Sequence, residues 1–423
     1  MLSLALLRNN TKLVIERLAV KNFDAAEIVQ KVLDTDSKRK EIQVQSDNLQ
    51  AEMNKISKSI GQLFKEGKKE EADKAKAQTT DIKEKIKELT QESTTVIEEL
   101  NKLLVQLPNI PSDLVPTGDS AEDNEVVKEG GNIPSLYDGA KPHWELAEQY
   151  DIIDFELGNK ITGAGFPVYK GKGAKLQRAL INFFLDENEQ AGYTEVQPPL
   201  FVNEDSGFGT GQLPDKEGMM YHVTEDNFYL IPTAEVPVTN IYRDVILKEK
   251  DFPVKNTAYT PCFRREAGSY GKDVRGLNRL HQFDKVEIVQ IQHPDKSYET
   301  LDQMVSHVES ILIKLELPYR ILRLCGGDMS FTSALTYDFE VYSTAQKRWL
   351  EVSSVSNFES YQANRLKLRF KDENKKTQLA HTLNGSSLAL PRILAALLEN
   401  NQTDEGIKIP EVLRSFTGFD SIK

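Results

Sequence analysis

The sequence predicts an α+β protein in which a long antiparallel helical hairpin precedes a large mixed domain. Three observations predict this fold class. Residues 36–107 carry two heptad seams separated by a short polar turn. Prolines and acidic residues interrupt the pattern over 108–134, and short β-rich runs alternate with helical runs over 135–423. We therefore expect an N-terminal domain over 1–107, a linker over 108–134 and an α+β domain over 135–423.

The hairpin follows from the spacing of its seam residues, which alternates between four and three and keeps them on one face of an under-wound helix. A glycine within 64–69, Gly67, favours a helix stop and a tight reversal. Helices of roughly 30 to 36 residues would extend about 45 to 55 Å, so we expect a projecting arm. The two seams are Ile42, Ser46, Leu49, Met53, Ile56, Ile60 and Leu63, then Ala72, Ala75, Thr79, Ile82, Ile86, Leu89, Ser93, Val96, Leu100, Leu103 and Leu107.

Beyond the hairpin, Pro108, Pro111 and Pro116 end the second helix and begin the linker. The mixed region that follows contains neither GxxxxGK[ST] nor GxGxxG, so the sequence supports neither a P-loop nor a Rossmann nucleotide site. We expect strands near 195–196, 228–231 and 286–291, and helices near 175–189, 297–315 and 393–399.

Composition excludes several classes of protein. With 423 residues, 39% hydrophobic and 28% charged, the chain is neither wholly disordered nor fibrous. A net charge of -12 argues against non-specific coating of nucleic acid, so a nucleic-acid partner needs a local basic patch. Cys262 and Cys325 stand alone, which argues against a disulfide framework or structural zinc. The apolar run Leu2 to Leu7 is too short for a signal h-region or a membrane span, and we expect a cytoplasmic protein.

The densest cluster of chemically active side chains runs through Phe263-Arg264-Arg265-Glu266-Ala267-Gly268, Arg275-Gly276-Leu277 and His281-Gln282-Phe283 to Lys285 and Glu287. A strand, a loop and a returning strand would bring Arg264, Glu266, Phe283 and Glu287 to facing positions. Arginine pairs with phosphate oxygens and an aromatic ring stacks on a base, so this surface could hold a nucleotide. The alternative is a solvated charged hairpin, because charged residues are mostly exposed.

The same cluster resembles motif 2 of class II aminoacyl-tRNA synthetases and, more narrowly, the seryl-tRNA synthetases of bacterial type. Residues 192–201 are similar to motif 1, with Pro199 in the family's proline position, and 383–392 are similar to motif 3. Thr233-Ala234-Glu235 resembles the family's serine-binding segment, and Glu351-Val352-Ser353-Ser354 its ATP and metal segment. The five segments occur in the family's order, and the resemblance covers essentially the whole chain. One departure is Arg265, which stands where many relatives have serine.

The resemblance implies a fold and an activity. The fold is a catalytic domain built on an antiparallel sheet flanked by helices, behind the coiled-coil arm. The activity is that of a serine–tRNA ligase, which makes seryl-adenylate from serine and ATP and transfers the seryl group to the 3′ adenosine of serine tRNA, and of selenocysteine tRNA where present. Mg²⁺ is the implied cofactor, with ATP as a substrate. The implied assembly is a homodimer formed through motif 1, with neither DNA nor a membrane as partner.

The resemblance also implies residue roles. Arg264 contacts the α-phosphate and the serine carboxylate, Arg392 holds the γ-phosphate, Phe283 stacks on adenine and Glu266 holds the adenine end. Arg264, Glu266 and Arg392 form the catalytic set. Glu351 and Ser354 bind the metal, and Arg265, Val352 and Ser353 complete the ATP site. The serine-binding set is Thr233, Ala234, Glu235, Glu287, Asn384 and Ser386. Arg392 also stands at a helix start, where the helix dipole disfavours a cation unless an anion is bound.

A tRNA-binding role for the arm depends on lysines near its tip, Lys65, Lys68, Lys69, Lys74 and Lys76. By resemblance the arm embraces the long variable branch of serine tRNA. The alternative is a solvated charged face, because Glu66, Glu70, Glu71 and Asp73 are interleaved.

Two other classes of function predict sequence features that this chain does not have. A coiled-coil interaction protein that has lost catalysis would be expected to lack Arg264, Glu287, Glu351 or Arg392, and all four are present. A synthetase-like ligase that charges a carrier protein would lack the long arm, which is complete here.

Overall fold

The computed structural model describes residues 1–266 and 275–423, which form two compact units. The first unit comprises Met1–Ala19 and Phe23–Pro108, and the second comprises Val20–Asn22 and Asn109–Lys423. Two residues of the motif noted above, Ala267 and Gly268, lie outside the described residues. Among the residues that the structure describes, no helix is both long enough and apolar enough to cross a membrane.

The first unit is helical, and its third helix is longer than predicted. That helix has 40 residues and begins at Ala26, ahead of the heptad pattern. The reason is that Val29 and Val32 in its first turns are fully buried, as are Val14 and Leu18 of the preceding helix, so these turns belong to a small core. The helices are α1 (Leu4–Asn9), α2 (Thr11–Ala19), α3 (Ala26–Lys65) and α4 (Lys69–Leu104).

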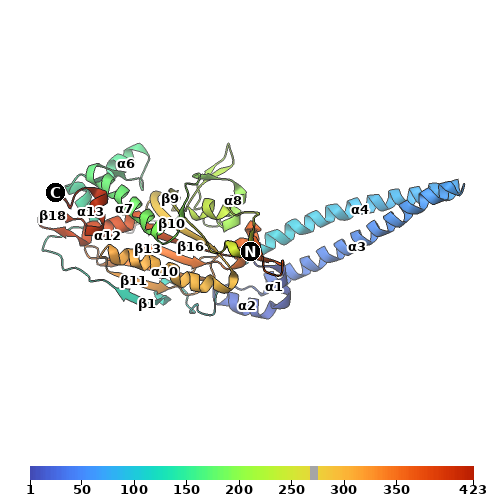
Figure 1. Ribbon diagram of the computed structural model, residues 1–423, viewed down its shortest axis with the longest axis horizontal. Coiled ribbons are helices and arrows are strands. Elements are labelled where there is room, and N and C mark those ends of the chain that lie inside the picture. The colour runs from blue at the N-terminus through green and yellow to red at the C-terminus, as the bar shows by residue number, and fades with distance from the viewer. Residues whose placement is uncertain (267–274) are drawn as a thin grey trace. The chain divides into compact units, whose positions relative to one another are not determined.

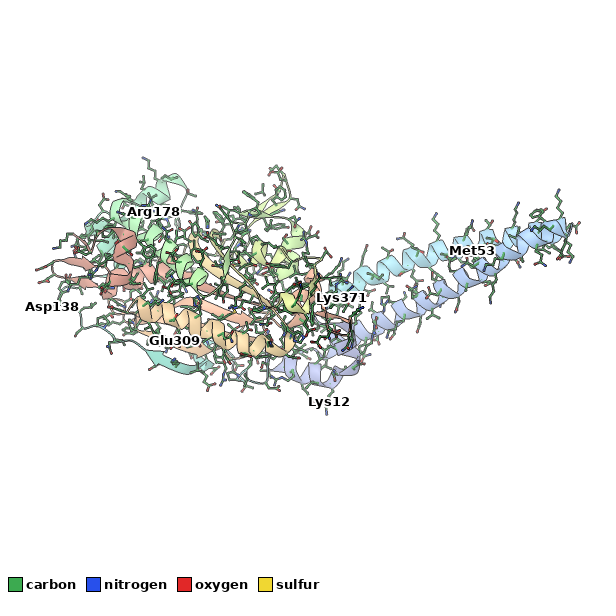
Figure 2. All side chains as sticks on the ribbon, in the orientation of Figure 1. Lys12, Met53, Asp138, Arg178, Glu309 and Lys371 are labelled. Atoms are coloured by element: carbon green, nitrogen blue, oxygen red, sulfur yellow. The ribbon has the colours of Figure 1, made fainter. Side chains whose placement is uncertain are left out.

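The predicted hairpin is confirmed. Helices α3 and α4 run side by side along their length (Figure 1). Over 42–65, the seven predicted seam positions are the ones shielded from solvent, including Met53, which Figure 2 labels. Gly67 adopts φ +76° between the two helices, a conformation that other residues rarely adopt. The heptad spacing therefore located both the buried stripe and the reversal.

An antiparallel sheet forms the centre of the second unit, as predicted. Its neighbouring strands are antiparallel except for β4 and β9, which are parallel. The strands lie in the spatial order β1 (Glu125–Gly130), β11 (Tyr319–Arg323), β12 (Leu335–Ser343), β13 (Arg348–Asn357), β16 (His381–Ala389), β10 (Gln282–Gln292), β9 (Val254–Phe263) and β4 (Thr194–Glu195).

Helices pack against this sheet and bury its main core. Phe183 of α7, Leu312 of α10 and Leu397 of α12 share that core with Ile288 and Phe339 from the strands. Figure 1 shows α7, α10 and α12 beside the sheet. The helices of this unit are α5 (His143–Gln149), α6 (Phe155–Ile161), α7 (Gly171–Gln190), α8 (Glu204–Thr210), α9 (Glu235–Asn240), α10 (Ser297–Lys314), α11 (Ser360–Leu366), α12 (Leu390–Asn400) and α13 (Glu411–Thr417).

Smaller sheets complete the second unit. Helices predicted near 175–189, 297–315 and 393–399 correspond to α7, α10 and α12, and the strands predicted near 195, 228 and 286 to β4, β7 and β10. The small sheets pair β2 (Ile153–Asp154) with β3 (Val168–Tyr169); β5 (Phe201–Val202) and β6 (His222–Val223) with β7 (Phe228–Leu230); β8 (Ile246–Lys248) and β15 (Thr377–Leu379) with β14 (Arg369–Lys371); and β17 (Gln402–Thr403) and β19 (Ser421–Ile422) with β18 (Gly406–Lys408).

The two faces of β10 have different neighbours. Val286 and Ile288 belong to the main core, whereas Val289 packs in a separate cluster with Ala234 and Ala258. Because successive strand residues point to opposite faces, Glu287 shares a face with Val289. This places Glu287 on the side of the sheet where Ala234 and α9 lie.

Candidate active site

Arg264 stands directly after β9, where the chain leaves this strand for the connection to β10. Its backbone N–H donates to the His281 carbonyl at 2.9 Å, which continues the pairing one residue beyond Phe263 and Gln282. Its guanidinium carbon lies 5.2 Å from the centre of the Phe283 ring. The structure therefore brings these two predicted ATP-binding residues together in a cation–π contact.

The two residues after Arg264, Arg265 and Glu266, have different environments. The Arg265 side chain is exposed, while its backbone N–H donates to the Met219 carbonyl at 2.8 Å. Glu266 has φ +48°, and its Oε2 accepts from Arg279 Nε at 2.6 Å. The carboxylate of Glu266 is thus held by an arginine to which the sequence assigned no role.

Arg392 connects three elements of the site. It lies in the first turn of α12, as predicted. Its Nε donates to the Asn278 carbonyl at 3.0 Å, and its Nη1 donates to the Glu351 carbonyl at 2.8 Å. The Glu351 carboxylate lies 3.8 Å from the same Nη1. The guanidinium is therefore oriented by Asn278, in the segment that precedes β10, and by Glu351 of β13.

The predicted ATP and metal segment lies within β13. Glu351 is exposed, Val352 and Ser353 are buried, and Ser354 is partly buried. Ser353 donates its hydroxyl to the Ser386 carbonyl at 2.6 Å, which ties β13 to β16. The exposed side chain of Glu351 is accessible to a ligand.

Asp338 is an acidic neighbour of this segment that the sequence did not single out. It lies on β12 opposite Ser354. Burial, with a further contribution from the Glu351 carboxylate, raises the pKa of Asp338 well above its usual range, and a hydrogen bond with Ser354 opposes the shift. The Asp338 Oδ1 atom is buried and has no hydrogen-bond partner among the described residues. An unpartnered carboxylate oxygen beside another carboxylate favours a bound cation.

The donor atoms around Asp338 fit Mg²⁺. Glu351, Ser354 and Asp338 offer oxygen ligands, which this ion prefers, and it commonly takes only one or two carboxylates besides phosphate oxygens and water. Across the described ranges, no cluster of three or more His, Cys, Asp and Glu side chains is arranged to hold a metal.

The predicted serine-binding residues converge on the face of β10 that carries Glu287. Thr233 donates its hydroxyl to Glu287 Oε2 at 3.2 Å and accepts the Glu235 backbone N–H at 3.2 Å. Ser386 lies directly opposite Glu287 in the pairing of β16 with β10. Ala234 is fully buried and contributes packing. These side chains form a small, largely buried polar cluster, which is the pocket referred to below.

The two carboxylates of this pocket differ in how their charge is balanced. Lys285 Nζ lies 2.7 Å from Glu287 Oε2, and both side chains are nearly buried. No basic side chain in the described part of the chain forms an ion pair with Glu235. Burial, together with the nearby Glu287 carboxylate, raises the pKa of Glu235 to about 7. Glu235 is therefore the carboxylate whose ionised form gains most from a cationic ligand.

Asn384 adds an unpartnered donor to the pocket. It is buried on β16, and its amide favours the ionised form of Glu235. Its Nδ2 atom nevertheless has no hydrogen-bond partner of ordinary geometry among the described residues. A buried donor without a partner is costly, so a polar ligand in this pocket would be stabilised by it.

Sequence reasoning gave no individual role to four residues that organise the site, although it named Lys285 within the motif 2 cluster and Gln362 within the continuation of the ATP and metal segment. The position of Lys285 could have predicted its contact with Glu287, because it stands two positions before Glu287 and alternate residues share a strand face. The signal for Gln362 is the resemblance of its segment, although its contact with Glu235 was not predicted. Asp338 and Asn278 have no signal, because their roles arise from contacts between elements distant in sequence.

The five lysines predicted to bind tRNA are all exposed near the α3–α4 reversal. Lys68 forms an ion pair with Glu66 at 2.9 Å, and Lys76 lies 5.4 Å from the Phe64 ring centre. The exposed positions of Lys65, Lys69 and Lys74 leave their charges accessible.

Comparisons with known proteins cover the whole chain. Residues 1–111 match the family described as "Seryl-tRNA synthetase N-terminal domain", and residues 221–401 match "tRNA synthetase class II core domain (G, H, P, S and T)". The serine–tRNA ligase of Salinibacter ruber is 52% identical over 100% of this chain and 99% of that protein. The serine–tRNA ligase of Chlorobaculum parvum is 46% identical over the full length of both. The crystal structure of seryl-tRNA synthetase from Pyrococcus horikoshii complexed with ATP superposes with a TM-score of 0.92 at 33% identity, covering 100% of this chain and 99% of that one.

Proposed function

The chain belongs to the seryl-tRNA synthetase family, and from that membership we propose how its own side chains carry out the family's reaction. The protein is an ATP-dependent ligase that charges tRNA with serine. In the first step, a carboxylate oxygen of serine attacks the α-phosphorus of ATP, and the bond to the leaving pyrophosphate breaks. In the second, the seryl group passes to the 3′ adenosine of serine tRNA, or of selenocysteine tRNA where present, and AMP leaves.

Arg264 is the residue that we assign to the reacting centre, where it contacts the α-phosphate and the serine carboxylate. One observation carries this assignment. The guanidinium is held against Phe283, yet its one hydrogen bond in the described part of the chain is a long one, 3.4 Å from Nε to the Pro232 carbonyl. Its remaining N–H groups are available to a substrate. A pre-positioned cation stabilises negative charge that develops at the α-phosphate.

The rest of the ATP site is assigned from the contacts around it. Phe283 stacks on adenine, and Glu266, held by Arg279, accepts from the adenine end while Arg265 lies beside it. Arg392 holds the γ-phosphate. Its Nε and Nη1 donate to backbone carbonyls, and no contact of its Nη2 appears among the described residues. The two fixed N–H groups orient the remaining donors toward a ligand.

We assign Mg²⁺ binding to Glu351 and Ser354, with Asp338 next to them and Val352 and Ser353 anchoring the strand. When bound, Mg²⁺ neutralises charge on the phosphates. The chain's own contribution is to hold these oxygen atoms in place. Ser353 does so through its hydrogen bond to the Ser386 carbonyl, which also connects the metal segment to the serine pocket.

Serine recognition divides between the two buried carboxylates. Glu235, which lacks a cationic partner, binds the serine ammonium. Glu287, already balanced by Lys285, accepts the serine hydroxyl, with Thr233, Asn384 and Ser386 nearby. Alanine and glycine would leave these buried groups unpaired, which can reduce their use by about 10⁴-fold. Threonine would be excluded by its extra methyl group.

The arm over 36–107 is assigned to binding serine tRNA, within a domain over 1–107. The catalytic domain is assigned to 135–423 together with β1, which lies in the expected linker 108–134 and belongs to the sheet of the second unit. The support for the role of the arm is the group of exposed lysines at the reversal. The working location is the cytoplasm, because charged tRNA is consumed there.

We also propose a homodimer formed through the segment 192–201. The support is that β4, within this segment, ends the sheet in the described part of the chain. Light scattering at micromolar concentration should give twice the mass of 47.8 kDa. A single-chain mass would exclude this assembly.

Serine-dependent ATP–pyrophosphate exchange, followed by charging of purified serine tRNA, tests the function. We expect exchange with serine and little with alanine, glycine or threonine. A folded protein that exchanges pyrophosphate without preference for serine would contradict the assignment of the pocket.

A further inference from the structure

A buried histidine contacts two segments of the site that are far apart in sequence. His143, the first residue of α5, is fully buried. Its Nε2 accepts the Leu277 backbone N–H at 2.8 Å, and its Nδ1 lies 2.7 Å from Glu399 Oε1. A backbone N–H only donates, so Nε2 is the unprotonated nitrogen and Nδ1 donates to the carboxylate. His143 therefore connects the segment that precedes β10 to α12.

Glu399 is held by several further donors. Its Oε1 accepts the His143 backbone N–H at 2.9 Å and the Gln346 amide at 2.9 Å, and its Oε2 accepts the Ser343 hydroxyl. Burial alone would raise the pKa of this carboxyl, but the bonds from His143 and Ser343 outweigh it and lower the pKa. The result is an ionised, saturated carboxylate on α12, the helix whose first turn carries Arg392.

The segment that contacts His143 is Arg275-Gly276-Leu277, which lies between β9 and β10 in the sequence. Gly276 has φ +64°, and a Cβ atom there would lie 2.2 Å from His143 Nε2. The Arg275 guanidinium lies 4.9 Å from the centre of the Trp144 ring. The Arg275 side chain and the Gly276 backbone are thus placed against the start of α5, which gives a physical reason for arginine and glycine at these two positions.

The next residue, Asn278, connects this segment to Arg392 in the proposed ATP site. Its carbonyl accepts from Arg392 Nε at 3.0 Å. Its side-chain amide donates to Gln346 Oε1 at 3.0 Å, and Gln346 in turn donates to Glu399. The carbonyl that orients Arg392 is therefore fixed by a closed set of buried and partly buried hydrogen bonds that includes His143.

We propose that His143 is a positioning residue for ATP binding. Through the Leu277 N–H and the Glu399 carboxylate it fixes the Asn278 carbonyl, and so the direction in which Arg392 presents its free donors. This inference rests on the proposed role of Arg392 in holding the γ-phosphate. His143 itself touches no substrate.

Two substitutions separate the two hydrogen bonds of His143 in the full-length protein. His143→Asn retains a donor near the Nδ1 position for Glu399 but lacks an acceptor for Leu277. His143→Gln places an amide oxygen near the Nε2 position and can restore that acceptor. His381→Asn is the matched control, because His381 is a partly buried histidine that contacts Ser297 at 2.8 Å at the far end of β16.

The measurement is the KM for ATP and for serine in pyrophosphate exchange, with Tm recorded for each variant. We expect His143→Asn to raise the KM for ATP by about threefold to tenfold, the effect of one lost hydrogen bond, with the KM for serine unchanged. His143→Gln should recover most of that increase, and His381→Asn should match the parent. A purely structural role would lower Tm and the active fraction without separating the two KM values.

Arg392→Ala, measured in parallel, distinguishes the two possible failures. If Arg392→Ala is impaired while folded His143→Asn has a normal KM for ATP, the inference is overturned and the proposed function stands. If Arg392→Ala itself has a normal KM for ATP and normal exchange, the assignment of Arg392 and the inference fall together. Should His143→Asn not fold, Gly276→Ala disturbs the same contact from the hairpin side, and a normal KM for ATP in that folded variant overturns the inference.

Discussion

Gln362 donates its side-chain amide to Glu235 Oε1 at 2.6 Å, and both side chains are buried. The same amide donates to the Thr210 carbonyl at 3.0 Å, and Gln362 Oε1 accepts the Thr382 hydroxyl at 2.7 Å. A neutral donor thus holds the carboxylate in position without cancelling its charge. This arrangement supports the proposed pairing of Glu235 with the serine ammonium, whereas Glu287 is already paired with a buried lysine.

Gln362→Ala should weaken serine binding more than ATP binding. The substitution leaves Glu235 and Thr382 with unsatisfied buried groups, which costs about 1 to 3 kcal/mol of stability. We expect a higher KM for serine and a nearly unchanged KM for ATP in pyrophosphate exchange. Gln378→Ala is the control, since Gln378 is an exposed glutamine that donates to Asp372 at 2.8 Å. Equal KM changes for both substrates would argue against the positioning role of Gln362.

Serine binding should weaken as pH falls through 7. The pKa of Glu235 in the folded protein is about 7, above its ordinary 4.5, so the carboxyl is protonated below pH 7 and cannot pair with an ammonium. If only the ionised form binds, lowering the pH from 8 to 6 raises the Kd for serine about tenfold. Folding stability has the opposite trend, because Glu235 binds a proton more tightly in the folded protein than in the unfolded chain. The contribution of Glu235 to the free energy of unfolding therefore falls as pH rises from 4.5 to 7.

Isothermal titration with serine across this pH range provides the measurement. Glu235→Gln removes the titrating group and should bind serine weakly with little dependence on pH. A pH dependence that persists unchanged in Glu235→Gln would assign the titration to another group.

Glu351→Gln and Ser354→Ala should each increase the Mg²⁺ concentration needed for half-maximal exchange. Loss of an oxygen ligand or of its supporting contacts commonly costs about 10- to 100-fold in metal affinity. Saturating Mg²⁺ should restore much of the rate in Ser354→Ala. Glu405→Gln, at an exposed glutamate of the same unit, should leave the requirement unchanged. An unaltered Mg²⁺ requirement in both test variants would exclude Glu351 and Ser354 as ligands.

Replacing Lys65, Lys68, Lys69, Lys74 and Lys76 together by alanine should impair tRNA charging and spare pyrophosphate exchange. Lost phosphate contacts reduce affinity and flatten its dependence on salt. Arginine at the same five positions keeps the charge and should retain charging. Deleting 36–107 and closing the gap with a short linker should impair tRNA charging more severely than the alanine variant and should also spare pyrophosphate exchange. Normal charging by the folded alanine variant would show that these lysines are not the RNA contact.

The sequence was sufficient for features that depend on local periodicity. Seam residues such as Ile42 and Ile82 are buried where the heptads placed them, and β9 and β10 form the hairpin that the Arg264 to Glu287 cluster predicted. The early start of α3 was not predicted, because its first turns pack in a core outside the heptads. The contacts of Asp338 with Ser354 and of Gln362 with Glu235 were also missed, because they depend on strand register and on helix placement.

The assignment of Arg264 and Arg392 to the phosphates of ATP is the central claim, and serine-dependent ATP–pyrophosphate exchange tests it most directly. Arg264→Ala and Arg392→Ala should each reduce exchange by about 10² to 10³, which corresponds to about 2.7 to 4 kcal/mol of lost transition-state stabilisation. Arg178→Ala, at an exposed arginine on α7 that Figure 2 labels, should exchange at the parent rate. Near-normal exchange by a folded Arg264→Ala or Arg392→Ala variant would contradict the account.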